Sequence, residues 1–190
     1  DVGLPIEILE EELSKLNLSG YSIEPKSAMR GVIVGTQVII HQEEHAKTGY
    51  SITDFVRIIE SSKLSENVKT KATVVLERLG KAEELVHGHD HILYELGEVD
   101  TILDIVGVIS GLEALSIEKL YSSPLPCGWG IVNTKKGPLP IPAPATAQLI
   151  TMGNAKISPP KDPYLDAGEL VTPTGAAIVT TLASFDAPTI

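Results

Sequence analysis

Apolar residues recur every three or four positions in four stretches of the chain, and this period predicts helices. The four stretches are residues 6–18, 55–62, 66–86 and 99–115. Pro5 suits the first turn of the first helix, and Gly20 suits its end. Thr53 and Ser65 stand where the N-caps of the second and third helices are expected, and Gly88 should end the third.

Two segments follow the first helix, residues 21–24 and residues 31–42, and the second is rich in Val and Ile; together they predict a hairpin or meander. Eleven of the 13 prolines lie beyond residue 120, and proline fixes φ and removes an amide donor. We therefore expect extended loops in that part, with short helices beginning near Ala143 and Thr174. This mixture of helices, short strands and proline-rich loops predicts the α+β class, with α/β as the alternative.

The length of 190 residues suits one domain, with a small lobe at about residues 20–52. The longest apolar stretch, residues 101–117, contains Asp104 and Glu113 and is too short to cross a bilayer. We expect a buried helix there and no membrane association. The chain begins in a helical pattern without a Met, from which we expect that upstream sequence is missing and that this chain is a fragment.

Composition and charge narrow the class of partner. The chain has 25 Asp and Glu against 15 Lys and Arg, and this formal charge of −10 disfavours nucleic acids and anionic membranes. Cys127 is the single cysteine, so it cannot form an internal disulfide or a multi-cysteine zinc site. A reducing, cytoplasmic location is the simplest expectation.

The charge is distributed unevenly along the chain. Residues 82–118 carry nine carboxylates and no Lys or Arg, whereas residues 119–161 carry five lysines and no Asp or Glu. If the fold brings the two segments together, the cleft between them would suit a metal ion beside a phosphate or carboxylate ligand. The alternative is that both segments are solvated surfaces.

The densest group of metal donors is the sequence HGHDH at residues 87–91. In an extended segment, residues two apart point the same way, so His87, His89 and His91 could converge on one ion. Neutral imidazole suits zinc, nickel, copper or iron. The alternative is an exposed histidine-rich loop that binds nothing specific.

Two carboxylates and two glycines fall on one face of the helix predicted over residues 99–115. Asp100, Asp104, Gly107 and Gly111 are spaced i, i+4, i+7 and i+11. The carboxylates are candidates for contact with a metal or substrate, because an unpaired buried carboxylate is costly. Their alternative role is to complement the helix dipole, and the glycines could simply admit a neighbouring helix.

Two further patterns are weaker candidates for a metal site and an anion site. His41 and His45, in HQEEH, resemble the zinc-protease HExxH spacing only loosely. Thr172, Pro173 and Thr174 fit the N-cap and first turn of a helix, whose free amides could hold an anion. A plain capping role explains the same three residues.

Five sequence blocks together resemble the nickel insertion protein family, LarC. They are VHG at 86–88, ELGEVDTILDIVG at 95–107, SPLPCGWG at 123–130, GPLPIPAPAT at 137–146 and GELVTPTGAA at 168–177. The resemblance implies a lyase-type enzyme that inserts nickel into pyridinium-3,5-bisthiocarboxylic acid mononucleotide. The product would be the nickel-pincer cofactor used in lactate racemase maturation. It also implies that these residues are the N-terminal portion of a longer nickel insertion protein, with CTP as a second cofactor on a C-terminal domain beyond them.

The resemblance also implies site residues. His87, Glu95, Asp100 and Asp104 match the family's donors, and His89 and His91 are added from the neighbouring loop as metal ligands. Lys136, Thr172 and Thr174 are expected to bind the nucleotide-type substrate, and no catalytic residue is assigned. At residues 92–94 the chain has Ile-Leu-Tyr where relatives show His-Phe-His, so the activity of this member stays open.

Two other functions use the same donors. One is a metal-dependent hydrolase, in which a carboxylate-held ion activates water. The other is a non-catalytic nickel-storage or assembly domain that forms a homo-oligomer, with the Gly107 and Gly111 face packed against another subunit.

Overall fold

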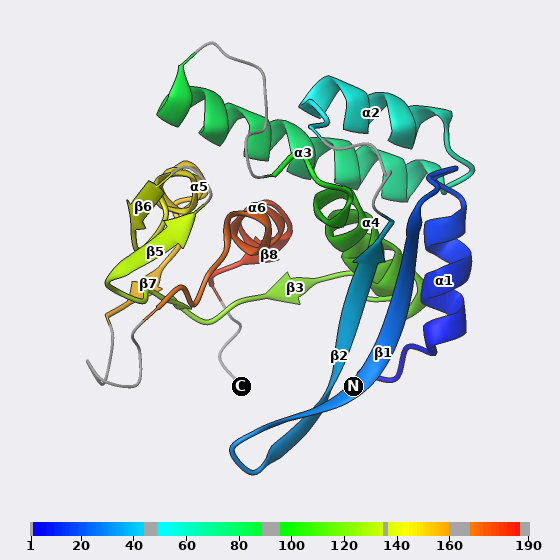
Figure 1. Ribbon diagram of the computed structural model, residues 1–190, viewed down its shortest axis with the longest axis horizontal. Coiled ribbons are helices and arrows are strands. Elements are labelled where there is room, and N and C mark those ends of the chain that lie inside the picture. Colours follow the sequence, from blue (N-terminus) through cyan, green and yellow to red (C-terminus); the bar gives the residue numbers. More distant parts are fainter. Residues whose placement is uncertain (1, 44–48, 89–95, 135–136, 160–167, 187–190) are drawn as a thin grey trace. The chain divides into compact units, whose positions relative to one another are not determined.

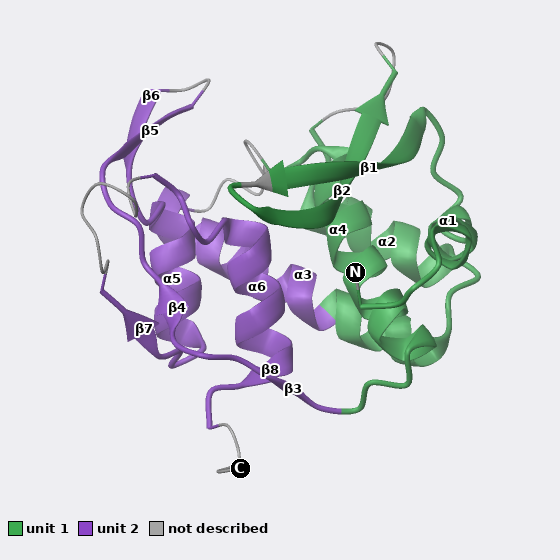
Figure 2. Ribbon diagram, turned by 90° about the horizontal axis from the view of Figure 1, so that it is seen from below, with its two compact units in different colours: residues 1–73, 92–118 green, residues 74–91, 119–190 purple. Residues whose placement is uncertain are grey.

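The computed structural model describes residues 2–43, 49–88, 96–134, 137–159 and 168–186 (Figure 1). Within these ranges the chain forms six helices and short strands that pair two by two, so the predicted α+β class is confirmed. The chain divides into two compact units, described here one at a time (Figure 2). Unit 1 holds residues 1–73 and 92–118, and unit 2 holds residues 74–91 and 119–190.

Helices supply the core of unit 1. They are α1 (Ile6–Ser14), α2 (Ile52–Ser61), the beginning of α3 (Glu66–His87) and α4 (Val99–Ala114). The predicted helices are confirmed, although α1 ends earlier than expected. In α4 nine residues are buried, among them Ile102 and Ile105 with no exposed surface. Across the described part of the chain, no helix combines the length and apolar character that a bilayer crossing needs.

Side chains fix the beginnings of two of these helices. The Ser51 hydroxyl accepts a hydrogen bond from the Asp54 backbone at 3.1 Å, and the Asp54 carboxylate accepts one from the Ser51 backbone at 3.1 Å. The prediction of Thr53 as this N-cap is wrong, because the reciprocal bonds place the cap two residues earlier. Ser65 is confirmed as the cap of α3, and Gly88 follows its last residue with φ of +81°.

An antiparallel hairpin follows α1, in which β1 (Tyr21–Arg30) pairs with β2 (Ile33–Gln42). The predicted hairpin is confirmed, but its first strand runs six residues past the expected end at Glu24. Pro25 is the first residue past that end, and it lacks the amide that a central strand needs. In a sheet of two strands both strands are edges, so Pro25 fits opposite Val38.

The glycines of α4 let α1 approach closely. A Cβ at Gly107 would lie 3.3 Å from Leu9 Cδ1, and one at Gly111 would lie 3.1 Å from Leu4 Cδ2. Leucines of the same chain therefore fill this face. The expectation that it packs against another subunit is wrong, and the alternative that the glycines admit a neighbouring helix is confirmed.

Unit 2 contains the remainder of α3, two short helices and three pairs of very short strands. The helices are α5 (Pro144–Met152) and α6 (Pro173–Leu182), which begin where the sequence predicts. Parallel pairs join β3 (Leu120–Tyr121) to β8 (Ala183–Ser184) and β4 (Leu125–Pro126) to β7 (Ile157–Ser158). An antiparallel pair joins β5 (Ile131–Thr134) to β6 (Gly137–Pro140). These pairs hold the proline-rich segments around the two helices.

Candidate functional site

An exposed acidic edge marks the beginning of α4 in unit 1. Asp100 and Asp104 lie one helical turn apart, and both face solvent while their neighbours Leu103 and Ile105 are buried. The Asp100 carboxylate accepts a hydrogen bond from the Thr101 backbone at 2.7 Å. Among the described residues, no basic side chain forms an ion pair with either carboxylate.

The electrostatics of this edge favour a bound cation. Asp104 is an exposed residue, yet the protein atoms around its carboxyl partly desolvate it, and this desolvation together with the negative charge of Asp100 raises its pKa from 3.8 to about 6. A raised pKa means that the ionised form of Asp104 is disfavoured in the protein. A positive ion bound beside the carboxylate would stabilise that form and displace the proton. The acidic edge is therefore a candidate contact for a cation, and a complete metal site at this edge stays a prediction.

His87 is the other described donor of the predicted metal set, and it belongs to unit 2. It is the last residue of α3, and its Nε2 lies 3.6 Å from Glu83 Oε2, one turn earlier. Sequence reasoning missed Glu83, although the spacing of four residues on a predicted helix was available as a signal. The structure therefore pairs imidazole with carboxylate at the C-terminal end of α3.

The structure brings together part of the predicted metal set. Asp100 and Asp104 share one helix edge, and His87 lies beside Glu83. His89, His91 and Glu95 lie outside the described residues, and the meeting of all six donors stays a prediction. Among the residues described, no three His, Cys, Asp or Glu side chains form a group that could hold a metal.

The predicted anion site at α6 has its expected backbone. Thr172 is the N-cap, and its hydroxyl accepts a hydrogen bond from Gly175 N at 3.2 Å, as capping requires. Pro173, the first residue of the helix, has no amide hydrogen. The Thr174 amide and hydroxyl are thus the groups of this turn left to a ligand. Lys136, the third predicted substrate residue, lies outside the described ranges.

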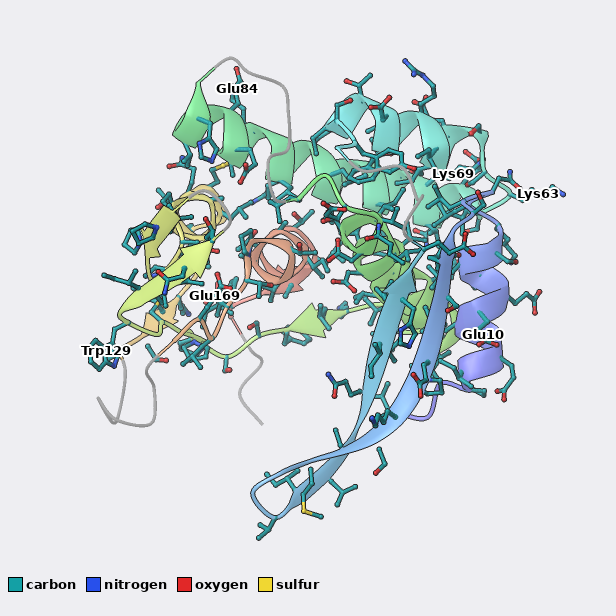
Figure 3. The ribbon with its side chains drawn as sticks, viewed as in Figure 1. Glu10, Lys63, Lys69, Glu84, Trp129 and Glu169 are labelled. Carbon is teal, nitrogen blue, oxygen red and sulfur yellow. The ribbon has the colours of Figure 1, made fainter. Side chains whose placement is uncertain are left out.

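Backbone contacts bring three of the sequence blocks together in unit 2. Gly168 N donates to Trp129 O at 3.1 Å, and Ile141 N donates to Gly130 O at 3.0 Å. A Cβ on Gly128 would lie 1.9 Å from Gly168 O, so only glycine fits there. The loop of residues 127–130 is therefore clamped between the segments that precede α5 and α6, and its exposed Trp129 points away from the ribbon (Figure 3). Sequence reasoning had left this tryptophan without a role.

The two remaining candidates do not gain support as reactive groups. His41 lies in β2 and its Nε2 is 2.8 Å from Glu24 Oε2 across the hairpin, so the loose HExxH resemblance lacks the helix that it requires. His45 lies outside the described residues. Burial raises the pKa of Cys127, which makes its thiol less nucleophilic rather than more.

Comparison with known proteins gives a consistent result. The family described as Nickel insertion protein matches residues 1–189. A protein from Geotalea uraniireducens that is named for nickel insertion is 45% identical over 189 residues, which are 96% of this chain and 46% of that protein. One from Dictyoglomus thermophilum, also named for nickel insertion, is 41% identical over 188 residues, with 97% and 47% covered.

A third relative carries a more specific name. The pyridinium-3,5-bisthiocarboxylic acid mononucleotide nickel insertion protein of Desulfitobacterium hafniense is 40% identical over 184 residues, which are 95% of this chain and 44% of that protein. The chain thus spans about half the length of the curated relatives it matches. No solved structure matches the chain.

Proposed function

This chain belongs to the nickel insertion protein family, and from this premise we propose that it is the nickel-handling, N-terminal portion of a longer nickel insertion enzyme. The substrate we propose is pyridinium-3,5-bisthiocarboxylic acid mononucleotide, the molecule in the name of the Desulfitobacterium relative. The complete protein would form the nickel-pincer cofactor in a CTP-dependent, lyase-type reaction in the cytoplasm. Nickel is the ion that the reaction consumes.

The observation that carries the proposal is the unbalanced carboxylate pair of α4. Two acidic side chains, Asp100 and Asp104, stand one turn apart with no described basic partner, and the pKa of Asp104 is raised to about 6. Such a pair pays a repulsive cost that a divalent ion removes. Nickel takes imidazole and carboxylate ligands, so His87, His89, His91 and Glu95 are proposed to complete its coordination.

The substrate is proposed to bind through the beginning of α6. A nucleotide phosphate suits the positive end of a helix, where backbone amides and the dipole both favour an anion. Because the Thr172 hydroxyl is engaged as the cap, we assign the phosphate contact mainly to Thr174. Lys136 is proposed to add a positive charge to this contact.

Calorimetry of the metal-free chain with Ni²⁺ tests the nickel site. We expect binding tighter than millimolar, and the double substitution Asp100→Asn and Asp104→Asn should weaken it at least tenfold, as expected when charged ligands are lost. Glu10→Gln is the matched control, because Glu10 is exposed on α1 and belongs to no proposed site. Absent binding, or equal binding by the double variant, would refute the role of the acidic edge.

Mass spectrometry of the complete protein with Ni²⁺, CTP and the dithiocarboxylate nucleotide tests the reaction itself. We expect a metallated product, and His87→Ala or Asp100→Ala should reduce its yield. Two other outcomes would replace the proposal. Release of product from phosphoesters without metallation would indicate a hydrolase, and tight nickel binding without any metallation would indicate a storage or assembly domain.

A further inference from the structure

Trp129 is an exposed aromatic side chain on a backbone that leaves it little freedom. It is 46% exposed, and its own carbonyl accepts the hydrogen bond from Gly168 N. Its neighbours on both sides are also held, because Gly128 fits tightly against Gly168 O and Gly130 O accepts from Ile141 N. The backbone that carries the indole is therefore held in place while the ring stays partly exposed, so a flat ligand can bind it without a cost for ordering the loop.

Exposed aliphatic residues lie close to Trp129 in the chain and beside its loop. Ile131, two residues after Trp129, is 69% exposed, and Leu170, two residues after Gly168, is 44% exposed. Leu170 lies beside the loop, because its Cγ would be 3.3 Å from a Cβ on Gly128. An exposed indole on a loop next to an exposed leucine suits a flat ring rather than an extended polar chain.

One short backbone segment links the Trp129 loop to the proposed phosphate contact. Gly168 N is bonded to Trp129 O, and Thr172, the N-cap of α6, follows four residues later. Thr174 is six residues from Gly168, a segment of at most about 22 Å when fully extended. The loop that carries the indole and the start of α6 thus belong to neighbouring parts of one segment in unit 2.

We propose that Trp129 is the platform on which the cationic pyridinium ring of the mononucleotide stacks, with its phosphate directed to the start of α6. The proposal rests on the proposed function, which supplies the substrate class. Among aromatic side chains, indole attracts a cation most strongly across its face. A pyridinium ring combines that positive charge with a flat shape, so it gains from both stacking and the cation–π interaction. Trp129 would therefore be a positioning residue that selects the charged ring.

Fluorescence can test this contact directly, because Trp129 is the single tryptophan of the chain. The probe is nicotinamide mononucleotide, an available pyridinium mononucleotide, titrated into the intact chain. We expect saturable quenching of the emission. Ribose 5-phosphate, which lacks the ring, should leave the emission unchanged. Only unsaturated, collisional quenching, or equal changes with ribose 5-phosphate, would overturn the proposal.

Variants give a second readout that does not depend on emission. Trp129→Leu should weaken binding of the probe in calorimetry about tenfold, whereas Trp129→Phe should retain most of it, since Phe keeps an aromatic face. Tyr121→Leu is the matched control, because Tyr121 is an equally exposed aromatic residue on β3, at 45% exposure. Equal binding by Trp129→Leu and the unaltered chain would overturn the proposal.

The test separates this inference from the proposed function. If the complete protein metallates its substrate and Trp129→Leu does so with an unchanged KM, the platform is wrong and the nickel function stands. If no metallation occurs while the probe still quenches Trp129 saturably, the ring site stands and the nickel function fails. An emission shift that depends on protein concentration without ligand would instead assign the Trp129 surface to protein association and overturn the platform.

Discussion

Helix α4 and the β1–β2 hairpin of unit 1 are both rich in Val and Ile, yet α4 is largely buried and the hairpin is largely exposed. Nine residues of α4 are buried, whereas no hairpin residue with a described burial falls in the buried class. Met29, Val34 and Val38 lie on one hairpin face and are 64%, 62% and 42% exposed. Apolar composition therefore sets a tendency to be buried, and the partners supplied by the rest of the chain decide whether burial occurs.

The two faces of the hairpin explain part of the difference. The paired positions Ile23–Ile40, Pro25–Val38 and Met29–Val34 make one face free of charge, whereas Glu24, His41 and Lys26 lie on the other. At the base of the uncharged face, Tyr21 donates a hydrogen bond to Leu13 O at 3.2 Å, and Ile23 and Ile40 are half-buried. Toward the turn, Met29 and Val34 are mostly exposed, and cross-strand contacts of this kind are individually small.

The largest expected effect of a substitution lies in the core of α4. Ile102→Ala should lower the free energy of unfolding by about 2–5 kcal/mol, because Ile102 is fully buried and its truncation leaves a cavity. Val108→Ala on the same helix is the matched control, since Val108 is 42% exposed and should change the value by less than about 1 kcal/mol. Urea denaturation measures both. Similar losses for the two variants would break the contrast between buried and exposed apolar positions.

The capping box of α2 should give the next largest effect. Ser51→Ala removes the hydroxyl that receives the Asp54 amide, at a cost of about 1 kcal/mol. Thr53→Ala should cost less than about 0.5 kcal/mol, because Thr53 is already inside the helix. The midpoint of thermal or urea denaturation distinguishes the two. A larger effect at Thr53 would restore the cap that the sequence first suggested.

The sequence predicts those elements whose signals are local in the chain and misses those that depend on distant partners. Helices α3 and α4 could be predicted because their period and end signals are local, as at Ser65 and Gly88. The cap at Ser51 was missed because Thr53 is an equally good local candidate, and only the reciprocal bond with Asp54 decides between them. The length of β1 was missed because a proline in a strand is acceptable only when the strand is an edge, which is a property of the sheet.

The candidate site divides in the same way. Asp100 and Asp104 could be placed on one face because helical spacing alone requires it. Sequence could not predict their exposure or the raised pKa of Asp104, because both depend on which face of α4 the rest of unit 1 covers. The contacts that hold the Trp129 loop could not be predicted either, because Gly168 and Ile141 are distant in sequence and meet that loop only in the folded chain.

The acidic edge of α4 should produce a smaller, pH-dependent effect in the metal-free protein. The pKa of Asp104 is about 6 in the folded state against an ordinary value of 3.8, so between these values the folded protein holds the proton more strongly than the unfolded chain. Stability should therefore fall as pH rises through this window. Asp104→Asn should flatten the decline, and Glu10→Gln should leave it unchanged. Urea denaturation from pH 4 to 7 measures the effect, and an unaltered slope in Asp104→Asn would contradict it.

The smallest expected effect lies at the exposed end of the hairpin. Val34→Thr keeps the β-branched shape that suits a strand and replaces a methyl group with a hydroxyl. Since Val34 is 62% exposed and faces Met29, itself 64% exposed, the hydroxyl stays hydrated in the folded state. The free energy of unfolding should change by less than about 0.5 kcal/mol. A loss near that of Ile102→Ala, measured in the same urea series, would mean that this face is covered in solution, because only a buried contact can convert one methyl-to-hydroxyl exchange into a large cost.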